Sequence, residues 1–176
     1  MSSKYVDNTA IIQVIGAIYT NPKLLDLTDR YVITDQDFDN QFHRIVFGAI
    51  YKIHELGAAQ VTIENVSDFL SDRPKYEAIY KQNKGNEWIL KTVENCTPLS
   101  FDYYYGRLKK FSLLRAYDNY GVDVSDIYDP DNIKLIREDS SLRQHLLELE
   151  NFYYNETKRM ANLLKQYEEG DENAIR

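Results

Sequence analysis

The chain of 176 residues contains a single cysteine, Cys96, which excludes an internal disulfide and a zinc site built from cysteines. Four prolines and seven glycines are few for this length, and this scarcity favours helices over a turn-rich β-sandwich. No apolar run approaches the length of a membrane span, and the first residues, Met-Ser-Ser-Lys-Tyr-Val-Asp, lack the pattern of a signal peptide. These absences predict a helical, cytoplasmic protein without a membrane partner.

Motifs for nucleotide hydrolysis and calcium binding are missing as well. The phosphate-binding loop G-x-x-x-x-G-K-[ST] is absent, because no glycine in the chain is followed by lysine. We therefore expect no enzymatic activity and no cofactor in this chain. Three acids alternate as in a calcium loop, but the central glycine and bidentate glutamate of an EF-hand do not accompany Asp35, Asp37 and Asp39. These acids are better suited to capping helices.

Three histidines and the cysteine are the remaining candidates for chemistry. The histidines, His43, His54 and His145, lack the spacing of a metal cluster. We interpret His43 as a structural residue with satisfied hydrogen bonds, because it begins a helix with an apolar face. No basic residue adjoins Cys96 to lower the pKa of its thiol, which favours a small core residue over a nucleophile. No catalytic, cofactor-binding or metal residue is assigned.

The formal net charge of −7 argues against a chain that holds DNA by itself, because neutralising phosphates needs a surplus of Lys and Arg. One cationic cluster is interleaved with aromatic residues and is a candidate for nucleic-acid contact: Lys109, Lys110 and Arg115. Because the net charge of the chain is negative, we expect this cluster to form a solvated helix face. We expect weak or absent DNA binding.

An aromatic helix is the most informative feature of the sequence, in a chain with fifteen tyrosines. Ser100 suits its N-cap, and Gly121 suits its end because glycine readily adopts a positive φ. Steps of three and four residues put one stripe of side chains on one helix face: Phe101, Tyr104, Tyr105, Leu108, Phe111 and Tyr117. Tyrosine buries a ring while keeping its hydroxyl in water, so this stripe predicts docking rather than catalysis.

Upstream of this helix, apolar residues at helical spacing predict a compact helical head over residues 1–98. Gly16, in the first helix, permits the close approach of a neighbouring element. The predicted core of the head contains Ile15, Phe38, Ile45, Val46 and Ile50. The first expected helix begins at Asn8 or Thr9, and a short second one begins at Pro22. A third covers 42–56, and a fourth runs from its cap Thr62 to before Pro74. Two further short helices are expected around 76–80 and 87–93.

Downstream of Gly121, a loop over 122–131 precedes a second long helix. Its heptad seam, with Glu156 as the one polar member, contains Leu135, Leu142, Leu146, Leu149, Tyr153, Glu156, Met160, Leu163 and Tyr167. The two long helices predict a hairpin over residues 99–168, and the polar tail over 169–176 is expected to fray. The fold class is therefore all-α, with a compact helical head followed by an antiparallel two-helix hairpin.

Four short motifs follow one another between residues 8 and 120. They are Val14-Ile15-Gly16-Ala17-Ile18, then Asp37-Phe38 with His43-Arg44-Ile45-Val46-Phe47, then Val61-Thr62 through Leu70, and last Tyr103 through Arg115. Each motif alone is a weak signal. In this order and spacing they resemble the N-terminal domain of DnaB-type replicative DNA helicases, without the ATPase domain of that family.

This resemblance implies a collar that assembles from dimers, as a trimer of dimers, and docks primase or a helicase loader. ATP and magnesium would belong only to an ATPase domain. The alternative is a stand-alone phage or mobile-element adaptor that binds a host helicase or primase, as a loader or an inhibitor. The expected oligomer or partner interface comprises Phe101, Tyr104, Tyr105, Leu108, Phe111, Leu142, Leu146, Leu149 and Tyr153.

Overall fold

A computed structural model describes residues 4–124, 151, 154–155, 157–158 and 161. Throughout these residues the chain is all-helical and has no β-strand, as the sequence predicts. The chain divides into two units, Met1–Ser112 and Leu113–Arg176, which are described separately. The first unit, the head, extends past residue 98, where the sequence places its end, because the beginning of the aromatic helix packs into it.

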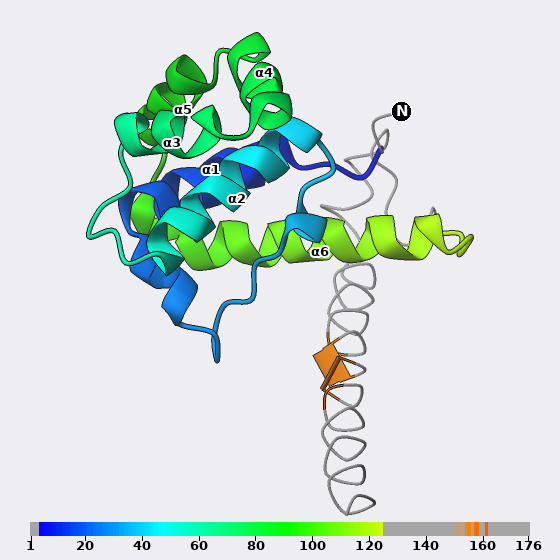
Figure 1. Ribbon diagram of the computed structural model, residues 1–176. Coiled ribbons are helices and arrows are strands. Elements are labelled where there is room, and N and C mark those ends of the chain that lie inside the picture. Colours follow the sequence, from blue (N-terminus) through cyan, green and yellow to red (C-terminus); the bar gives the residue numbers. More distant parts are fainter. Residues whose placement is uncertain (1–3, 125–150, 152–153, 156, 159–160, 162–176) are drawn as a thin grey trace, which may run out of the picture. The chain divides into compact units, whose positions relative to one another are not determined.

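The head is built around two helices that lie side by side, α1 and α2 (Figure 1). Helices α3, α4 and α5 lie on one side of this pair, and the beginning of α6 lies on the other. Short 3-10 turns join these elements. The order along the chain is α1 (Asn8–Thr20), η1 (Pro22–Asp26), η2 (Asp35–Asp37), α2 (Gln41–Glu55), α3 (Ile63–Ser71), α4 (Pro74–Gln82), α5 (Gly85–Glu94), η3 (Pro98–Ser100) and α6 (Phe101–Asn119).

The helix caps follow local chemistry, with one difference from the sequence analysis. Asp7, rather than Asn8 or Thr9, caps α1, because its carboxylate accepts a hydrogen bond from the backbone N–H of Ala10 at 3.0 Å. All three residues suit an N-cap, so spacing alone could not separate them. Thr62 caps α3 as predicted, and it forms a reciprocal capping box with Asn65.

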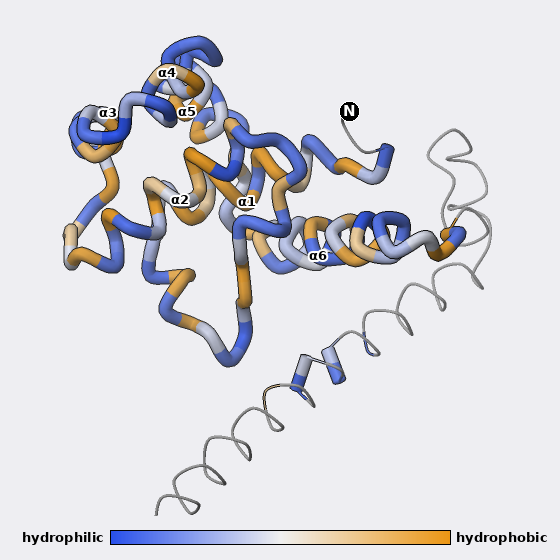
Figure 2. The backbone as a smooth tube through the Cα atoms, turned by 45° about the vertical axis from the view of Figure 1, so that its right-hand side comes forward, coloured by the Kyte–Doolittle hydropathy of each residue, from blue (hydrophilic) through white to orange (hydrophobic). Residues whose placement is uncertain are grey.

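One buried apolar cluster holds the head together, and α1 contributes the longest stretch of it. Figure 2 shows hydrophobic segments alternating with hydrophilic ones along α2 and α6, as expected for helices with one covered face. The five residues that the sequence places in the core are all buried in this cluster: Ile15, Phe38, Ile45, Val46 and Ile50.

Gly16 lies where α1 meets the end of α5, and the close approach expected there is present. A Cβ atom added to Gly16 would lie 2.8 Å from the Cβ atom of Cys96 and 3.1 Å from the backbone oxygen of Thr92. Neither atom belongs to the free end of a flexible side chain, so neither can yield without moving backbone. The glycine is therefore a packing requirement of this helix pair.

Helix α6 ends at Asn119, and Gly121 follows with a φ of +78°, as the sequence predicts. Ser100, the expected cap of this helix, is the last residue of the 3-10 turn that leads into it. The second helix of the predicted hairpin is described only at residues 151, 154–155, 157–158 and 161, all of which are helical. The predicted interface residues Leu142, Leu146, Leu149 and Tyr153 lie outside the described residues.

Candidate docking surfaces

The first part of α6 is fixed to the head by an ion pair with the cap of α1. The Nε atom of Arg107 donates to Oδ2 of Asp7 at 2.6 Å, and the Asp7 side chain is only 5% exposed. The other oxygen of this carboxylate caps α1. One buried acid therefore satisfies a helix N-terminus and anchors a second helix 100 residues away in the chain.

A second buried acid binds the neighbouring turn of α6. Asp37, whose side chain is 2% exposed, accepts bonds from Lys109 Nζ at 2.8 and 3.0 Å. It also accepts from the backbone N–H of Thr34 at 2.9 Å, which closes the turn η2. The capping role expected for this acid is thus present, and an ion pair accompanies it.

The expectation of a solvated cationic face on α6 is wrong. The ammonium group of Lys109 is bonded to Asp37, and the Lys109 side chain is largely covered. Lys110 is half-buried, and Arg115, in the second unit, is buried. Helical spacing placed these cations away from the aromatic stripe, but an acid distant in sequence covers Lys109.

The first part of the aromatic stripe of α6, from Phe101 to Leu108, faces the core of the head. Phe101 and Leu108 are buried in the head cluster, and Tyr104 and Tyr105 pack against it. Phe101 and Leu108 are therefore covered within one chain and are not free to form the partner interface assigned to them. Spacing correctly identified residues that share a face, but it could not show what covers that face.

Tyrosine hydroxyls along this contact account for part of the tyrosine content. The hydroxyl of Tyr31 is hydrogen-bonded to Asp102, and its ring meets Tyr105 edge-on with centroids 5.1 Å apart. The hydroxyl of Tyr105 accepts from the backbone N–H of Val32 at 2.9 Å. Burial and the adjacent Asp102 carboxylate raise the pKa of Tyr31, so this hydroxyl stays protonated at neutral pH.

Two exposed apolar residues, one in the turn η3 and one in the first turn of α6, were missed by the sequence analysis. Leu99 is 99% exposed and Tyr103, one turn later, is 62% exposed. The Tyr103 ring packs edge-on against Tyr104, and Arg107 donates to its hydroxyl at 3.3 Å. Such pre-positioned side chains suit an interface. A run of three tyrosines was the available signal, because three consecutive helix residues cannot all face one core.

Two histidines hold structural positions in the head. His54, at the end of α2, contacts Asp26 at 2.7 Å. His43 packs against the rings of Phe42 and Trp88, with centroids 5.6 and 5.1 Å away, and these two rings also meet each other edge-on. Its Nδ1 atom is buried without a hydrogen-bond partner, which corrects the expectation of a satisfied histidine. Burial lowers the pKa of His43, so the ring is neutral at physiological pH.

Cys96 is half-buried, as a packing residue beside Gly16. Its thiol lies 3.4 Å from the backbone oxygen of Gln13, and burial raises its pKa, which disfavours the reactive thiolate. Among the described residues no group of three or more His, Cys, Asp or Glu side chains could hold a metal ion. In the same residues no helix is long and apolar enough to span a membrane.

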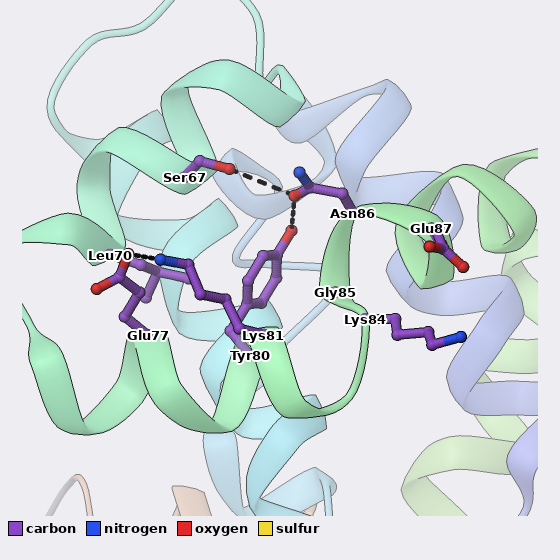
Figure 3. Close-up of a pocket in the computed structure, with 9 residues that line it drawn as sticks. All are labelled: Ser67, Leu70, Glu77, Tyr80, Lys81, Lys84, Gly85, Asn86 and Glu87. Carbon is purple, nitrogen blue, oxygen red and sulfur yellow. Dashed lines mark hydrogen bonds and ion pairs between the residues drawn. The ribbon is translucent and has the colours of Figure 1, made fainter.

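A pocket of about 260 Å³ lies between α3, α4 and α5 (Figure 3). The buried hydroxyl of Tyr80 donates to Asn86 Oδ1 at 2.8 Å, and the hydroxyl of Ser67 is 3.3 Å from the same oxygen. Burial raises the pKa of Tyr80, which keeps this hydroxyl a donor. These polar groups bond to one another and so join the three helices. We therefore interpret the pocket as part of the helix packing and not as a ligand site.

A larger groove, of about 410 Å³, separates α2 from α3 and the start of α4, and we name it the α2–α3 groove. One face of α2 forms one wall with residues at steps of three and four, and the end of α3 forms the other. Asp35 also lines the groove. The wall residues are Gln41, Arg44, Ile45, Gly48, Ala49 and Lys52 on α2, and Phe69, Leu70, Arg73 and Tyr76 opposite them.

The fold alone defines the head as an all-helical domain. The family model of the DnaB-like helicase N terminal domain matches residues 7–110. The chain belongs to this family, which confirms the resemblance drawn from its motifs. Membership relates the chain to the replicative helicases through a domain that is not itself catalytic.

A curated relative is similar over most of this chain. The SPbeta prophage-derived uncharacterized protein YorI of Bacillus subtilis (strain 168) is 41% identical over 123 residues. The match covers 70% of this chain and 24% of the relative. The chain thus spans about a quarter of the length of the relative that it matches.

Proposed function

We propose that this chain acts as a non-catalytic collar module of a DnaB-type replicative helicase. In this role it self-associates and docks a replisome protein, either primase or a helicase loader. The observation that carries the proposal is an exposed apolar pair: Leu99 in the turn η3 and Tyr103 on α6, the helix that two buried acids fix to a domain of this family. Exposed apolar groups on a rigid element are characteristic of association surfaces.

The proposed association surface is smaller than the stripe predicted from sequence, because Phe101 and Leu108 are covered by the head. A standard interface buries roughly 800 Å² per partner, so Leu99 and Tyr103 would form only the centre of it. We propose that the seam of the second hairpin helix completes the interface. The residues predicted for this seam are Leu142, Leu146, Leu149 and Tyr153.

Sedimentation equilibrium of the whole chain tests this proposal. We expect self-association at micromolar concentration, and a Leu99→Ser, Tyr103→Ser double variant that dissociates more readily. Leu56→Ser is the matched control, because Leu56 is also highly exposed but lies at the C-terminal end of α2. A wild-type chain that stays monomeric, or a double variant that associates like the wild type, would contradict the proposal.

A stand-alone adaptor is the second candidate, and the prophage origin of the relative favours it. Such an adaptor would bind a host helicase or primase through the same surface. Co-sedimentation with the host helicase separates the candidates, because an adaptor binds the assembled host ring, whereas a collar module associates with its own copies. For either candidate we expect no ATP hydrolysis, weak DNA binding and a cytoplasmic location.

A further inference from the structure

The α2–α3 groove is long enough to bind a helix. Its α2 wall extends from Gln41 to Lys52, which is about three helical turns or roughly 16 Å. In the middle of this wall lie Gly48 and Ala49, the smallest residues of the groove. A Cβ atom added to Gly48 would have no heavy atom within 4 Å. The wall is therefore open at Gly48, where another backbone can approach closely, whereas Ala49 is buried in the core.

The charge of the groove is opposite to that of the whole chain. Three cations, Arg44, Lys52 and Arg73, line it, against the single acid Asp35, whereas the chain carries a net charge of −7. A local cationic field on an acidic protein steers and selects acidic partners. The groove therefore favours a ligand that carries carboxylates on both sides of an apolar centre.

The three cations are held at the groove by interactions that leave them able to receive carboxylates. Arg44 Nε donates to the backbone oxygen of Phe38 at 2.6 Å. The guanidinium of Arg73 lies 3.9 Å from the centroid of the half-buried Phe69 ring. Lys52 pairs with Glu55 at 2.6 Å, and both side chains of this pair are about half exposed. Exposed pairs contribute little, so a partner carboxylate can replace Glu55.

We propose that the α2–α3 groove docks an acidic amphipathic helix of a partner protein. The apolar stripe of this helix would lie over Gly48 and the half-buried Phe69 ring, and its carboxylates would meet Arg44, Lys52 and Arg73. This inference rests on the proposed docking function and assigns it a second surface, separate from Leu99 and Tyr103. The open, small-residue centre favours a helix over a nucleic-acid strand, whose phosphates need cations along their whole path.

Fluorescence anisotropy with the full chain tests this assignment. The probe is a fluorescein-labelled peptide of about five helical turns, or 18 residues, with leucines at steps of three and four and glutamates flanking them. A second peptide carries lysine in place of every glutamate. We expect saturable binding of the acidic peptide, at least tenfold weaker binding of the basic one, and weakening of the acidic complex by salt.

Two variants change the groove in different ways. Arg73→Glu reverses an exposed cation, and Gly48→Gln places a side chain in the open centre of the α2 wall. We expect each to weaken peptide binding at least tenfold. Lys91→Glu, on an exposed position of α5, and Gly106→Gln, at an open position of α6, are the matched controls and should change binding less than twofold. Thermal unfolding of every variant checks that the head stays folded.

Equal binding of the acidic peptide to wild type, Arg73→Glu and Gly48→Gln would overturn the inference, as would no binding at all. Displacement of the peptide by a single-stranded oligonucleotide with higher affinity would also overturn it and assign the groove to nucleic acid. Loss of peptide binding at high chain concentration would assign the groove to a second copy instead. Sedimentation of the same samples reports self-association separately, so failure of the groove and failure of the proposed collar function are distinguishable.

Discussion

Replacing Gly16 with alanine tests the packing of α1 against the end of α5. Alanine is about 1 kcal/mol better than glycine in the interior of a helix, so an unhindered Gly→Ala change there stabilises a protein. At Gly16 the added methyl group would meet Cys96 Cβ at 2.8 Å and the backbone oxygen of Thr92 at 3.1 Å. Overpacking of this kind costs about 1–3 kcal/mol. The net result should be a destabilisation of up to about 2 kcal/mol.

Gly106→Ala is the matched control, because Gly106 lies inside α6 and its added Cβ atom has no heavy atom within 4 Å. Both variants gain the same helix propensity, so the difference between them measures the overpacking cost at Gly16. We expect Gly106→Ala to be stabilised by about 0.5–1 kcal/mol and the two variants to differ by about 1–3 kcal/mol.

Urea unfolding followed by circular dichroism provides the free energies, and thermal unfolding should show a shift of about 2–4 °C per kcal/mol. In a Cys96→Gly background the cost of Gly16→Ala should fall, because the nearest obstructing atom is gone while the Thr92 oxygen remains. A Gly16→Ala variant as stable as Gly106→Ala would show that α1 and α5 do not approach as described.

Three further changes test the core, the buried ion pair and the buried histidine. Ile50→Ala should destabilise the head by about 2–5 kcal/mol, because Ile50 is fully buried, and an unchanged urea midpoint would place it outside the core. Lys109→Met should cost about 3 kcal/mol by removing the ammonium group that is bonded to the buried Asp37. Adding Asp37→Asn should then cost less than it does in the wild type, and strict additivity would argue against the pair. The pKa of His43 is lowered by burial, so the unfolded chain takes up this proton first as pH falls below about 6.5, and stability decreases. Between about pH 7.5 and about pH 5.5 the wild type should therefore lose more thermal stability than His43→Leu, and equal losses would refute the assignment.

Local patterns in the sequence determined where the helices of this protein form and which face of each helix is buried. Spacing of three and four residues identified the core face of α2 with Ile45, Val46 and Ile50, and Gly121 marked the end of α6. These features depend on contacts within a turn or two, so they are visible in a short window. The same window could not choose among Asp7, Asn8 and Thr9 as the cap of α1, because adjacent residues of similar chemistry compete for it.

Only the tertiary structure decided what covers each face. The stripe with Phe101 and Leu108 is the same whether a partner or the head covers it, since helical spacing carries no information about the neighbouring element. Lys109 is a cation in any structure, but its pairing with Asp37 joins residues 72 positions apart. The α2–α3 groove likewise combines residues of α2 with Phe69, Leu70, Arg73 and Tyr76, which are brought opposite them by the packing of the head. Contacts between residues distant in sequence therefore placed Phe101 and Leu108 of the predicted docking stripe in the core, and left Leu99 and Tyr103 exposed.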